Sequence, residues 1–241
     1  MEFAKAQRFT ARVSEKYFLT DNEHFLYLKF ELVLPDRMIF EAGQYVSFAV
    51  NALGERRSYS MATTPDDNHG FTLVAGMTKG GKGSIYLHDL KIGEEVEVLA
   101  PLGRFVAEST QNKLLFVATG SGIVPIYSMI CDLLINKQET RPMRLHWGLK
   151  NEANMFWFDN FERLAEAHPN FVFDPVLSEP GEEWSLCRGH VQDCLQRDFT
   201  KDRLAEWSGY VCGNPKMVDE VSALLIALGM QPEEVYREKY T

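Results

Sequence analysis

The sequence has few cysteines and no long apolar run. Its four cysteines, Cys131, Cys187, Cys194 and Cys212, are spread along the second half of the chain and form no C-x-x-C pair, which argues against a zinc site or an iron–sulfur cluster. No apolar stretch approaches the roughly 20 residues that cross a bilayer. Residues 1–5 also lack the basic start and apolar core of a signal peptide. We therefore expect a cytoplasmic chain with free thiols, no metal and no membrane contact.

The sequence also has fewer basic than acidic residues. The chain of 241 residues has 25 Lys and Arg against 34 Asp and Glu, a net charge of -9, and no dense basic run. Nucleic acid is therefore an unfavourable partner. Hydrophobic residues make up 45% of the chain, so it can bury a full core in one large domain or two ordinary ones.

The first hundred residues have the pattern of a β domain. Aromatic and β-branched runs at 25–32 and 44–50 are bounded by turn-forming residues. Residues 70–76 and 94–99 add two candidate strands, and 84–90 has the pattern of a helix. Short strands with frequent turns predict an antiparallel β-barrel.

The pattern changes near residue 112. Residues 114–118 form a continuous apolar run, typical of a strand buried on both faces. Helical and strand patterns then alternate, which predicts a doubly wound α/β domain with a parallel sheet. The expected helices are 125–136, 154–168, 190–199 and 216–228, and the expected strands are 143–148, 170–177 and one that includes 210–212. A polar stretch at 108–112 gives domains of 1–109 and 110–241.

Two motifs in the β domain suit a flavin. Arg57-Ser58-Tyr59-Ser60 offers a planar cation for a phosphate, a flat ring for stacking and hydroxyl donors. Gly80-Gly81-Lys82-Gly83-Ser84 precedes the expected helix, where backbone N–H groups can approach an anion. Taken singly, the first motif also fits an ordinary strand, and the second fits a flexible turn with Ser84 as helix N-cap.

Two further motifs follow strands of the α/β domain. Gly120-Ser121-Gly122 lies between a buried strand and a helix, a place that suits a dinucleotide pyrophosphate. Pro125 replaces the third glycine of the common dinucleotide fingerprint. Cys212-Gly213-Asn214-Pro215 lies between the last expected strand and the last long helix. A tight turn and a buried structural cysteine are the simpler interpretations of these two motifs.

The ordered set of four motifs, with Gly43-Gln44-Tyr45 and Pro101-Leu102-Gly103, resembles the ferredoxin–NADP reductase superfamily. Val124 and the terminal Thr241 depart from the common pattern. The resemblance implies an FAD-binding barrel and a nicotinamide-binding α/β domain. It assigns FAD binding to Arg57, Ser58, Tyr59, Ser60, Gly81, Lys82, Gly83, Ser84 and Tyr240. It assigns nicotinamide nucleotide binding to Thr119, Gly120, Ser121, Gly122, Cys212, Gly213, Asn214 and Pro215.

The activity implied by the resemblance is hydride transfer from NADH or NADPH to FAD, with Ser60, Cys212 and Glu238 at the reacting atoms. Tyr240 would cover the flavin, although a frayed terminus fits the tail as well. We expect NADH rather than NADPH, because Glu179 stands where users of NADPH commonly place arginine, although Lys150 or Arg188 could also reach the ribose. Electrons would pass to a separate ferredoxin, flavodoxin or oxygenase component. The alternatives are a reductase of free flavin, an electron-transfer subunit of a larger complex, and a binding protein without redox chemistry.

Overall fold

The computed structural model describes residues 3–108, 110, 112–200 and 203–240, which form two compact units. The first unit comprises the chain up to Ala107 and, in addition, the segment Tyr127–Lys137. The second unit comprises Glu108–Ile126 and the chain from Gln138 onward. The expected domain boundary falls on Ser109, outside the described residues, and stays a prediction.

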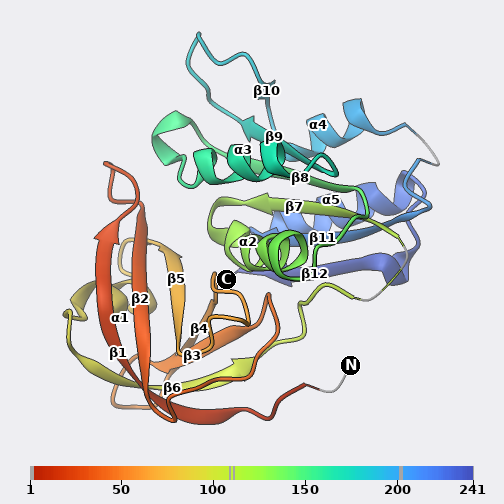
Figure 1. The fold of residues 1–241 in the computed structure, drawn as a ribbon. Coiled ribbons are helices and arrows are strands. Elements are labelled where there is room, and N and C mark those ends of the chain that lie inside the picture. Colours follow the sequence, from red (N-terminus) through yellow and green to blue (C-terminus); the bar gives the residue numbers. More distant parts are fainter. Residues whose placement is uncertain (1–2, 109, 111, 201–202, 241) are drawn as a thin grey trace. The chain divides into compact units, whose positions relative to one another are not determined.

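An antiparallel sheet makes up the first unit (Figure 1). Its order among the described residues is β4-β3-β6-β1-β2-β5, and the edge strands β4 and β5 contact each other. Just beyond β4, the Ala62 N–H donates to the Thr72 carbonyl of β5 at 2.8 Å. The predicted barrel is therefore confirmed. Its elements are β1 (Gln7–Phe18), β2 (Phe25–Leu34), β3 (Tyr45–Ala49), β4 (Arg56–Ser60), β5 (Gly70–Gly76), α1 (Lys82–Asp89) and β6 (Glu95–Leu102).

Alternating side chains fill the barrel. Phe30 of β2, Phe48 of β3 and Phe71 of β5 are fully buried, and the rings of Phe30 and Phe71 stack at 4.8 Å. Strand β1 was not predicted from the sequence, because its apolar positions alternate with polar and charged ones and no apolar run marks it. The motif at residues 57–60 lies inside β4.

A parallel sheet makes up the second unit (Figure 1), and it has the order β10-β9-β8-β7-β11-β12 within the described residues. The order reverses between β7 and β11, which makes their carboxyl ends the expected ligand site of such a sheet. The predicted doubly wound domain is confirmed. Its strands are β7 (Lys113–Thr119), β8 (Met143–Leu149), β9 (Phe171–Leu177), β10 (Cys187–Arg188), β11 (Trp207–Gly213) and β12 (Val235–Lys239).

Helices lie on both faces of this sheet. Helices α4 (Val191–Asp198) and α5 (Pro215–Ala227) share one core with Leu115 and Val211. Helix α3 (Phe158–Ala167) packs on the opposite face, where Phe161 meets Trp147 at 5.8 Å between ring centroids. It begins later than predicted, because Trp157 adopts a left-handed φ of 57°. Helix α2 (Ile123–Cys131) follows the turn η1 (Gly120–Gly122) and continues into η2 (Asp132–Asn136).

The cysteines and the carboxyl-terminal tail of the second unit differ from what the sequence predicted. Cys187 and Cys194 form a disulfide, so the prediction of four free thiols is wrong. The reason is local: β10 brings Cys187 beside the first turns of α4, whereas Cys131 and Cys212 are free and buried. The tail, for its part, forms strand β12, parallel to β11. None of the described helices is long and apolar enough to cross a membrane.

Candidate active site

The two flavin motifs meet at one point in the first unit. A Cβ atom on Gly83 would lie 2.2 Å from the Tyr59 hydroxyl and 3.1 Å from Cγ of Arg57. Glycine is therefore required where the first turn of α1 passes over β4. The structure brings Arg57 and Tyr59 together with residues 81–84, although the two motifs are more than 20 residues apart.

The amino end of α1 offers groups that suit a phosphate. Gly81 is the N-cap and makes no side-chain capping bond. The N–H groups of Lys82, Gly83 and Ser84 belong to the first helical turn, where no intrahelical acceptor exists, and the helix dipole favours an anion there. The Ser84 hydroxyl instead accepts the Thr78 N–H at 3.0 Å. Ser84 thus fixes the preceding loop and is not the N-cap that the simpler interpretation of this motif required.

Glu55 joins the two motifs, and the sequence did not reveal it. Its Oε2 accepts from the Lys82 ammonium at 2.6 Å and from the Asn51 amide at 2.7 Å, and its Oε1 lies 3.4 Å from the Arg57 guanidinium. The hydrogen bond from Lys82 is the main reason that the pKa of Glu55 is lowered. A carboxylate therefore already sits between the two cations that suit a phosphate.

The remaining residues of the first motif have distinct environments. Burial raises the pKa of Tyr59 to about 12, so its phenol stays neutral, and its ring meets Phe48 edge-on at 5.9 Å. Residues of a strand alternate between faces, so Ser58 points away from the side of Arg57 and Tyr59, whereas Ser60 ends the strand. Ser58 is exposed and Ser60 is buried.

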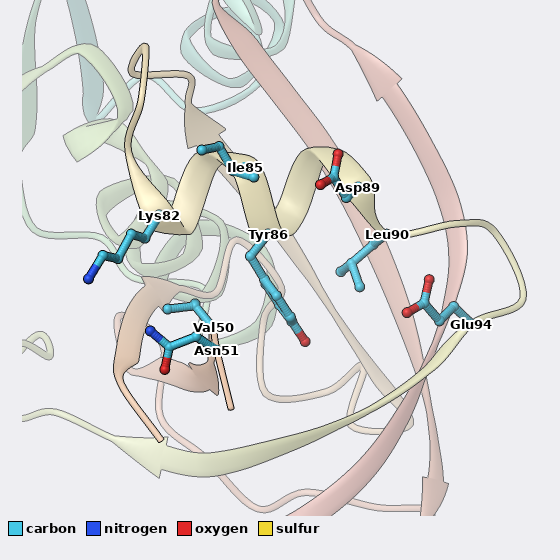
Figure 2. Close-up of a pocket in the computed structure, with 8 residues that line it drawn as sticks. All are labelled: Val50, Asn51, Lys82, Ile85, Tyr86, Asp89, Leu90 and Glu94. Atoms are coloured by element: carbon cyan, nitrogen blue, oxygen red, sulfur yellow. The ribbon is translucent and has the colours of Figure 1, made fainter. Parts of the chain in front are cut away.

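A cavity of about 450 Å³ lies beside α1 (Figure 2). Lys82 and Asn51 lie toward one end of it, and Asp89 and Glu94 toward the other (Figure 2). Sequence reasoning missed this cavity, since it depends on how α1 packs over the end of β3. Its full lining is Val50, Asn51, Lys82, Ile85, Tyr86, Asp89, Leu90 and Glu94.

In the second unit, the other two motifs also touch. A Cβ atom on Gly122 would lie 2.4 Å from the Cys212 carbonyl oxygen and 2.7 Å from Cα of Gly213. The Asn214 N–H donates to the Thr119 hydroxyl at 3.3 Å. This contact lies at the carboxyl ends of β7 and β11, where the strand order reverses. The position fits the pyrophosphate of a dinucleotide.

Side chains around this turn hold its shape. Gly120 has a φ of 54°, and its carbonyl accepts the Trp147 indole N–H at 3.0 Å. Asn214 caps α5, because its side-chain oxygen accepts the N–H groups of Lys216 at 3.0 Å and Met217 at 3.5 Å. Pro215 occupies the first turn of α5, where its lack of an N–H costs nothing. By capping α5, the Asn214 side chain stabilises the turn between β11 and α5. Ser121 lies within the same turn, in η1.

Cys212, Glu238 and Tyr240 converge at the end of β11. Cys212 is opposite Glu238 in the β11–β12 register, and the Tyr240 N–H donates to the Gly213 carbonyl at 2.9 Å. Burial, and then the Glu238 carboxylate, raise the pKa of the Cys212 thiol, while a hydrogen bond with the Tyr240 side chain lowers it. Cys212 is therefore held as a neutral thiol and not as a nucleophilic thiolate. The structure brings together three residues that only a resemblance had connected.

Three residues near the ends of β8, β9 and β10 were expected to distinguish the two nicotinamide nucleotides. The Glu179 carboxylate pairs with the Lys150 ammonium at 3.3 Å. Arg188 donates to the carbonyls of Gly181 at 3.0 Å and Glu182 at 2.9 Å. Both candidate cations therefore already have partners.

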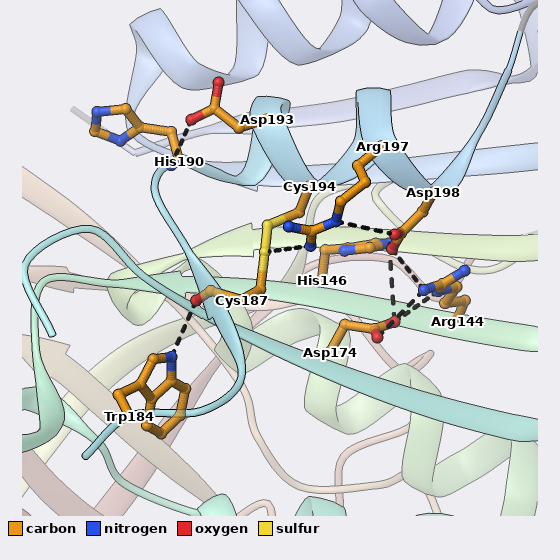
Figure 3. Close-up of a disulfide and its surroundings, with 10 residues drawn as sticks. All are labelled: Arg144, His146, Asp174, Trp184, Cys187, His190, Asp193, Cys194, Arg197 and Asp198. Carbon is orange, nitrogen blue, oxygen red and sulfur yellow. Dashed lines mark hydrogen bonds and ion pairs between the residues drawn. A yellow bond between two sulfur atoms is a disulfide. The ribbon is translucent and has the colours of Figure 1, made fainter. Parts of the chain in front are cut away.

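A buried histidine and three half-buried charged residues gather at α4 (Figure 3). His146 has no exposed surface, and neither ring nitrogen has a hydrogen-bond partner among the described residues. Its Nε2 lies 3.9 Å from Asp174 and 3.8 Å from Asp198. These three residues have a spacing that could hold a metal ion, but Arg144 already pairs with both carboxylates, at 2.6 and 2.5 Å. Arg144 thus supplies the positive charge that the carboxylates need.

Comparison with known proteins bears directly on these two units. Residues 10–106 match the oxidoreductase FAD-binding domain, and residues 116–223 match the oxidoreductase NAD-binding domain. The chain belongs to the ferredoxin–NADP reductase superfamily. FAD and a nicotinamide nucleotide are the cofactors of these two domains. The contact at Gly83 places the first turn of α1 over β4, and the contact at Gly122 places η1 at the carboxyl ends of β7 and β11, and both places suit the anionic groups of these cofactors.

Relatives of this reductase family include components of oxygenase systems. The chain is 33% identical over 219 residues to the reductase component DmpP of phenol 2-monooxygenase from Pseudomonas sp. (strain CF600), covering 89% of this chain and 60% of that protein. It is also 33% identical to the reductase subunit of an aromatic O-demethylase from Amycolatopsis sp. (strain ATCC 39116 / 75iv2), covering 87% and 64%.

A solved structure of a reductase has the same fold. The crystal structure of the Amycolatopsis cytochrome P450 reductase GcoB superposes with a TM-score of 0.88 at 28% identity, covering 98% of this chain and 70% of that one. The chain spans about three fifths of the length of the curated relatives that it matches.

Proposed function

We propose that this chain is the flavin and nicotinamide module of an electron-transfer reductase, which oxidises NADH and passes electrons to a separate acceptor protein. The observation that carries the proposal is the contact of Gly83 with Arg57 and Tyr59. It builds one anion-binding surface from two motifs and leaves the flat Tyr59 ring beside it. Bound FAD would accept a hydride from NADH and release electrons one at a time.

The residues of the chain would bind and orient the two cofactors. Arg57, Lys82 and the first turn of α1 would hold the flavin phosphates. Tyr59, kept neutral by burial, would lie against the flavin ring, and Ser60 would donate a hydrogen bond to it. The turn at Gly120–Gly122 would hold the dinucleotide pyrophosphate.

Near the nicotinamide, Cys212, Glu238 and Tyr240 would act sterically and electrostatically. Cys212 would present a neutral thiol to the ring, because burial and Glu238 keep its proton in place. Tyr240, fixed through its N–H to Gly213, would cover the flavin until the nicotinamide displaces it. Alignment of the reacting atoms is the main catalytic contribution that such a site can make.

NADH is the proposed reductant. The Glu179 carboxylate, held by Lys150, would accept hydrogen bonds from the adenosine ribose hydroxyls and repel a 2′-phosphate. The Nε and Nη2 atoms of Arg188 are already bound to carbonyls of its own loop, which competes with binding of that phosphate. We also propose a cytoplasmic location, where NADH is produced, and cell fractionation tests it.

We propose an oxygenase component or a ferredoxin as the acceptor. The support is that the relatives named above are reductase components of a phenol monooxygenase and an aromatic O-demethylase. Purified candidate acceptors can be compared with free flavin as substrates of the NADH-reduced protein. Faster reduction of free flavin than of any protein would favour the flavin-reductase alternative.

The direct test is the visible absorption spectrum of the purified protein, recorded without oxygen before and after NADH is added. Flavin bands that bleach would support both cofactor sites and hydride transfer. A colourless protein that stays colourless after FAD is supplied would refute the proposal. Flavin bands that NADH leaves unchanged, but NADPH bleaches, would refute only the choice of nucleotide.

A further inference from the structure

The disulfide of the second unit joins two segments with different exposure (Figure 3). Cys187 lies in the short strand β10 and is half-buried, whereas Cys194 lies in α4 and is fully buried. The two Cα atoms are 6.6 Å apart and the residues are seven positions apart in the chain. The half-buried sulfur is thus the one that a small molecule in solution can reach first.

A cation lies against that same sulfur. The Arg197 Nη2 is 2.9 Å from Cys187 Sγ, and Arg197 Nε lies 3.7 Å from the Asp198 carboxylate (Figure 3). A cation beside a cysteine favours the thiolate, which is the form that reacts with peroxides. The other two cysteines have the opposite environment: burial raises the pKa of Cys131 to about 11, and it also raises the pKa of Cys212.

The disulfide ties β10, which follows the loop after β9, to helix α4. Within this loop Trp184 donates its indole N–H to the Cys187 carbonyl at 3.0 Å, and Arg188 donates to three carbonyls. The Gly181 N–H donates to the Glu152 carboxylate at 2.9 Å. The loop itself is therefore held by mostly exposed hydrogen bonds, which are weak individually, and the covalent bond fixes β10 at its carboxyl end. The loop also carries Glu179.

We propose that Cys187 and Cys194 form a reversible, peroxide-sensitive redox site. The Cys187 thiolate attacks hydrogen peroxide, which breaks the O–O bond and gives a sulfenic acid and hydroxide. The Cys194 thiol then attacks the sulfenic sulfur, forms the disulfide and releases water. In sum, two thiols and one peroxide give one disulfide and two waters. A dithiol reductant reverses the reaction by thiol–disulfide exchange.

The bond has a consequence for the nucleotide site, and this part rests on the proposed function. With the disulfide intact, the β10 end of the loop that carries Glu179 is fixed to α4 before NADH arrives. With two free thiols, that end loses its covalent anchor and must be ordered on binding, which costs affinity. We expect the KM for NADH to be about three- to tenfold lower in the disulfide form, with kcat little changed.

Mass spectrometry of trapped thiols tests the site itself. The protein with bound flavin is reduced with dithiothreitol, desalted, exposed to hydrogen peroxide and alkylated. Loss of alkylation confined to Cys187 and Cys194 is expected, with Cys131 and Cys212 unchanged. Loss of no thiol, or equal loss at all four cysteines, would overturn the proposal.

Substitutions at Arg197 test the source of reactivity. Arg197→Gln should slow thiol loss by roughly three- to tenfold, whereas Arg197→Lys keeps the charge and should react almost as fast as the unsubstituted protein. An Arg197→Gln protein that reacts at the original rate would exclude the guanidinium as the activating group.

Steady-state kinetics test the consequence for NADH. The KM for NADH is measured in the oxidised and reduced protein, in Cys187→Ser and in the control Cys131→Ser. Only Cys187→Ser should lose the response to peroxide and keep the higher KM. Equal KM values in both redox states would overturn the link to the nucleotide site, and absence of any NADH oxidation would instead refute the proposed function while leaving the thiol result intact.

Discussion

The Oε2 atom of Glu55 lies 2.6 Å from the Nζ atom of Lys82, so the cation offered by α1 already has an anionic partner. The same carboxylate approaches Arg57 of β4. A flavin phosphate placed between these cations would meet the negative charge of Glu55. We therefore propose that Glu55 limits how tightly the first unit holds its flavin.

Replacing Glu55 with glutamine should tighten flavin binding. The neutral amide keeps the shape of the side chain and removes the competing charge, and exposed pairs of this kind are worth roughly a two- to fivefold change in an equilibrium constant. Fluorescence titration of the apoprotein with FAD measures the effect. Glu97→Gln, which breaks an exposed pair with Arg8 on β1, is the matched control and should not change the dissociation constant. Weaker binding in Glu55→Gln would contradict this role.

Replacing Gly83 with alanine should disrupt the contact between α1 and β4. Its Cβ would lie 2.2 Å from the Tyr59 hydroxyl, and such overpacking typically costs about 1–3 kcal/mol. We expect flavin affinity to fall by roughly tenfold, measured by the same titration, and the melting temperature to fall as well. Gly81→Ala is the control, since Gly81 has a φ of -69° and its nearest neighbour would be 3.2 Å away. Equal effects of both substitutions would show that the close contact at Gly83 is unimportant.

Replacing Glu179 with arginine should shift the choice of nucleotide toward NADPH. The change removes a carboxylate that repels the 2′-phosphate, supplies a guanidinium and releases Lys150 from its ion pair. The ratio of kcat/KM for NADPH to that for NADH should rise by roughly tenfold or more. Glu166→Arg, on the exposed side of α3, makes the same change in net charge and should leave the ratio as it is. An unchanged ratio in Glu179→Arg would mean that the adenosine ribose lies elsewhere.

His146 should make the protein less stable in acid. Burial lowers its pKa to about 4, against opposing effects of Asp174 and Asp198, while Arg144 and Arg197 lower it further. The unfolded chain, with a histidine pKa near 6.5, therefore binds more protons than the folded one between these values. The stabilisation is complete above about pH 6.5 and is lost as the pH falls toward 4.

Chemical denaturation at two pH values measures this effect. The contribution of His146 to the free energy of unfolding should be about 2 kcal/mol smaller at pH 5 than at pH 7. His146→Gln should lose that part of the pH dependence. His88→Gln, at a largely exposed side chain, should keep it. The same pH dependence in all three proteins would mean that His146 does not titrate as its burial requires.

Regular elements could be predicted because their hydrophobic period is local. The helix expected at 216–228 is Pro215–Ala227, and the strand expected at 143–148 is Met143–Leu149. The helix differs by one residue at both ends and the strand by one residue at its carboxyl end, since capping by Asn214 and the last ladder bonds of a strand depend on neighbours. Strand β12 was not predicted as a strand, because its charged residues form a strand only beside β11.

The flavin and nucleotide motifs could be named from the sequence, but their contacts could not. Glu55 reaches Lys82 only because the turn after β3 folds back, which Asn51 stabilises by accepting the Glu55 N–H at 3.1 Å. His146 and Asp174 become neighbours through the register of β8 with β9. The disulfide depends on how the loop before α4 returns to the sheet. Each of these contacts depends on the tertiary structure, and no periodic pattern in the sequence indicates it.

Gly122 is in backbone contact with Cys212 and Gly213, so each of the two loops is shaped by the other. Neither loop can therefore be exchanged without affecting the conformation of the other. A chimera that imports only the 119–122 loop from another reductase would place it against a foreign surface at the 212–215 turn. Coenzyme engineering of this chain should exchange the two segments as a pair, or leave both untouched and work on the loop after β9.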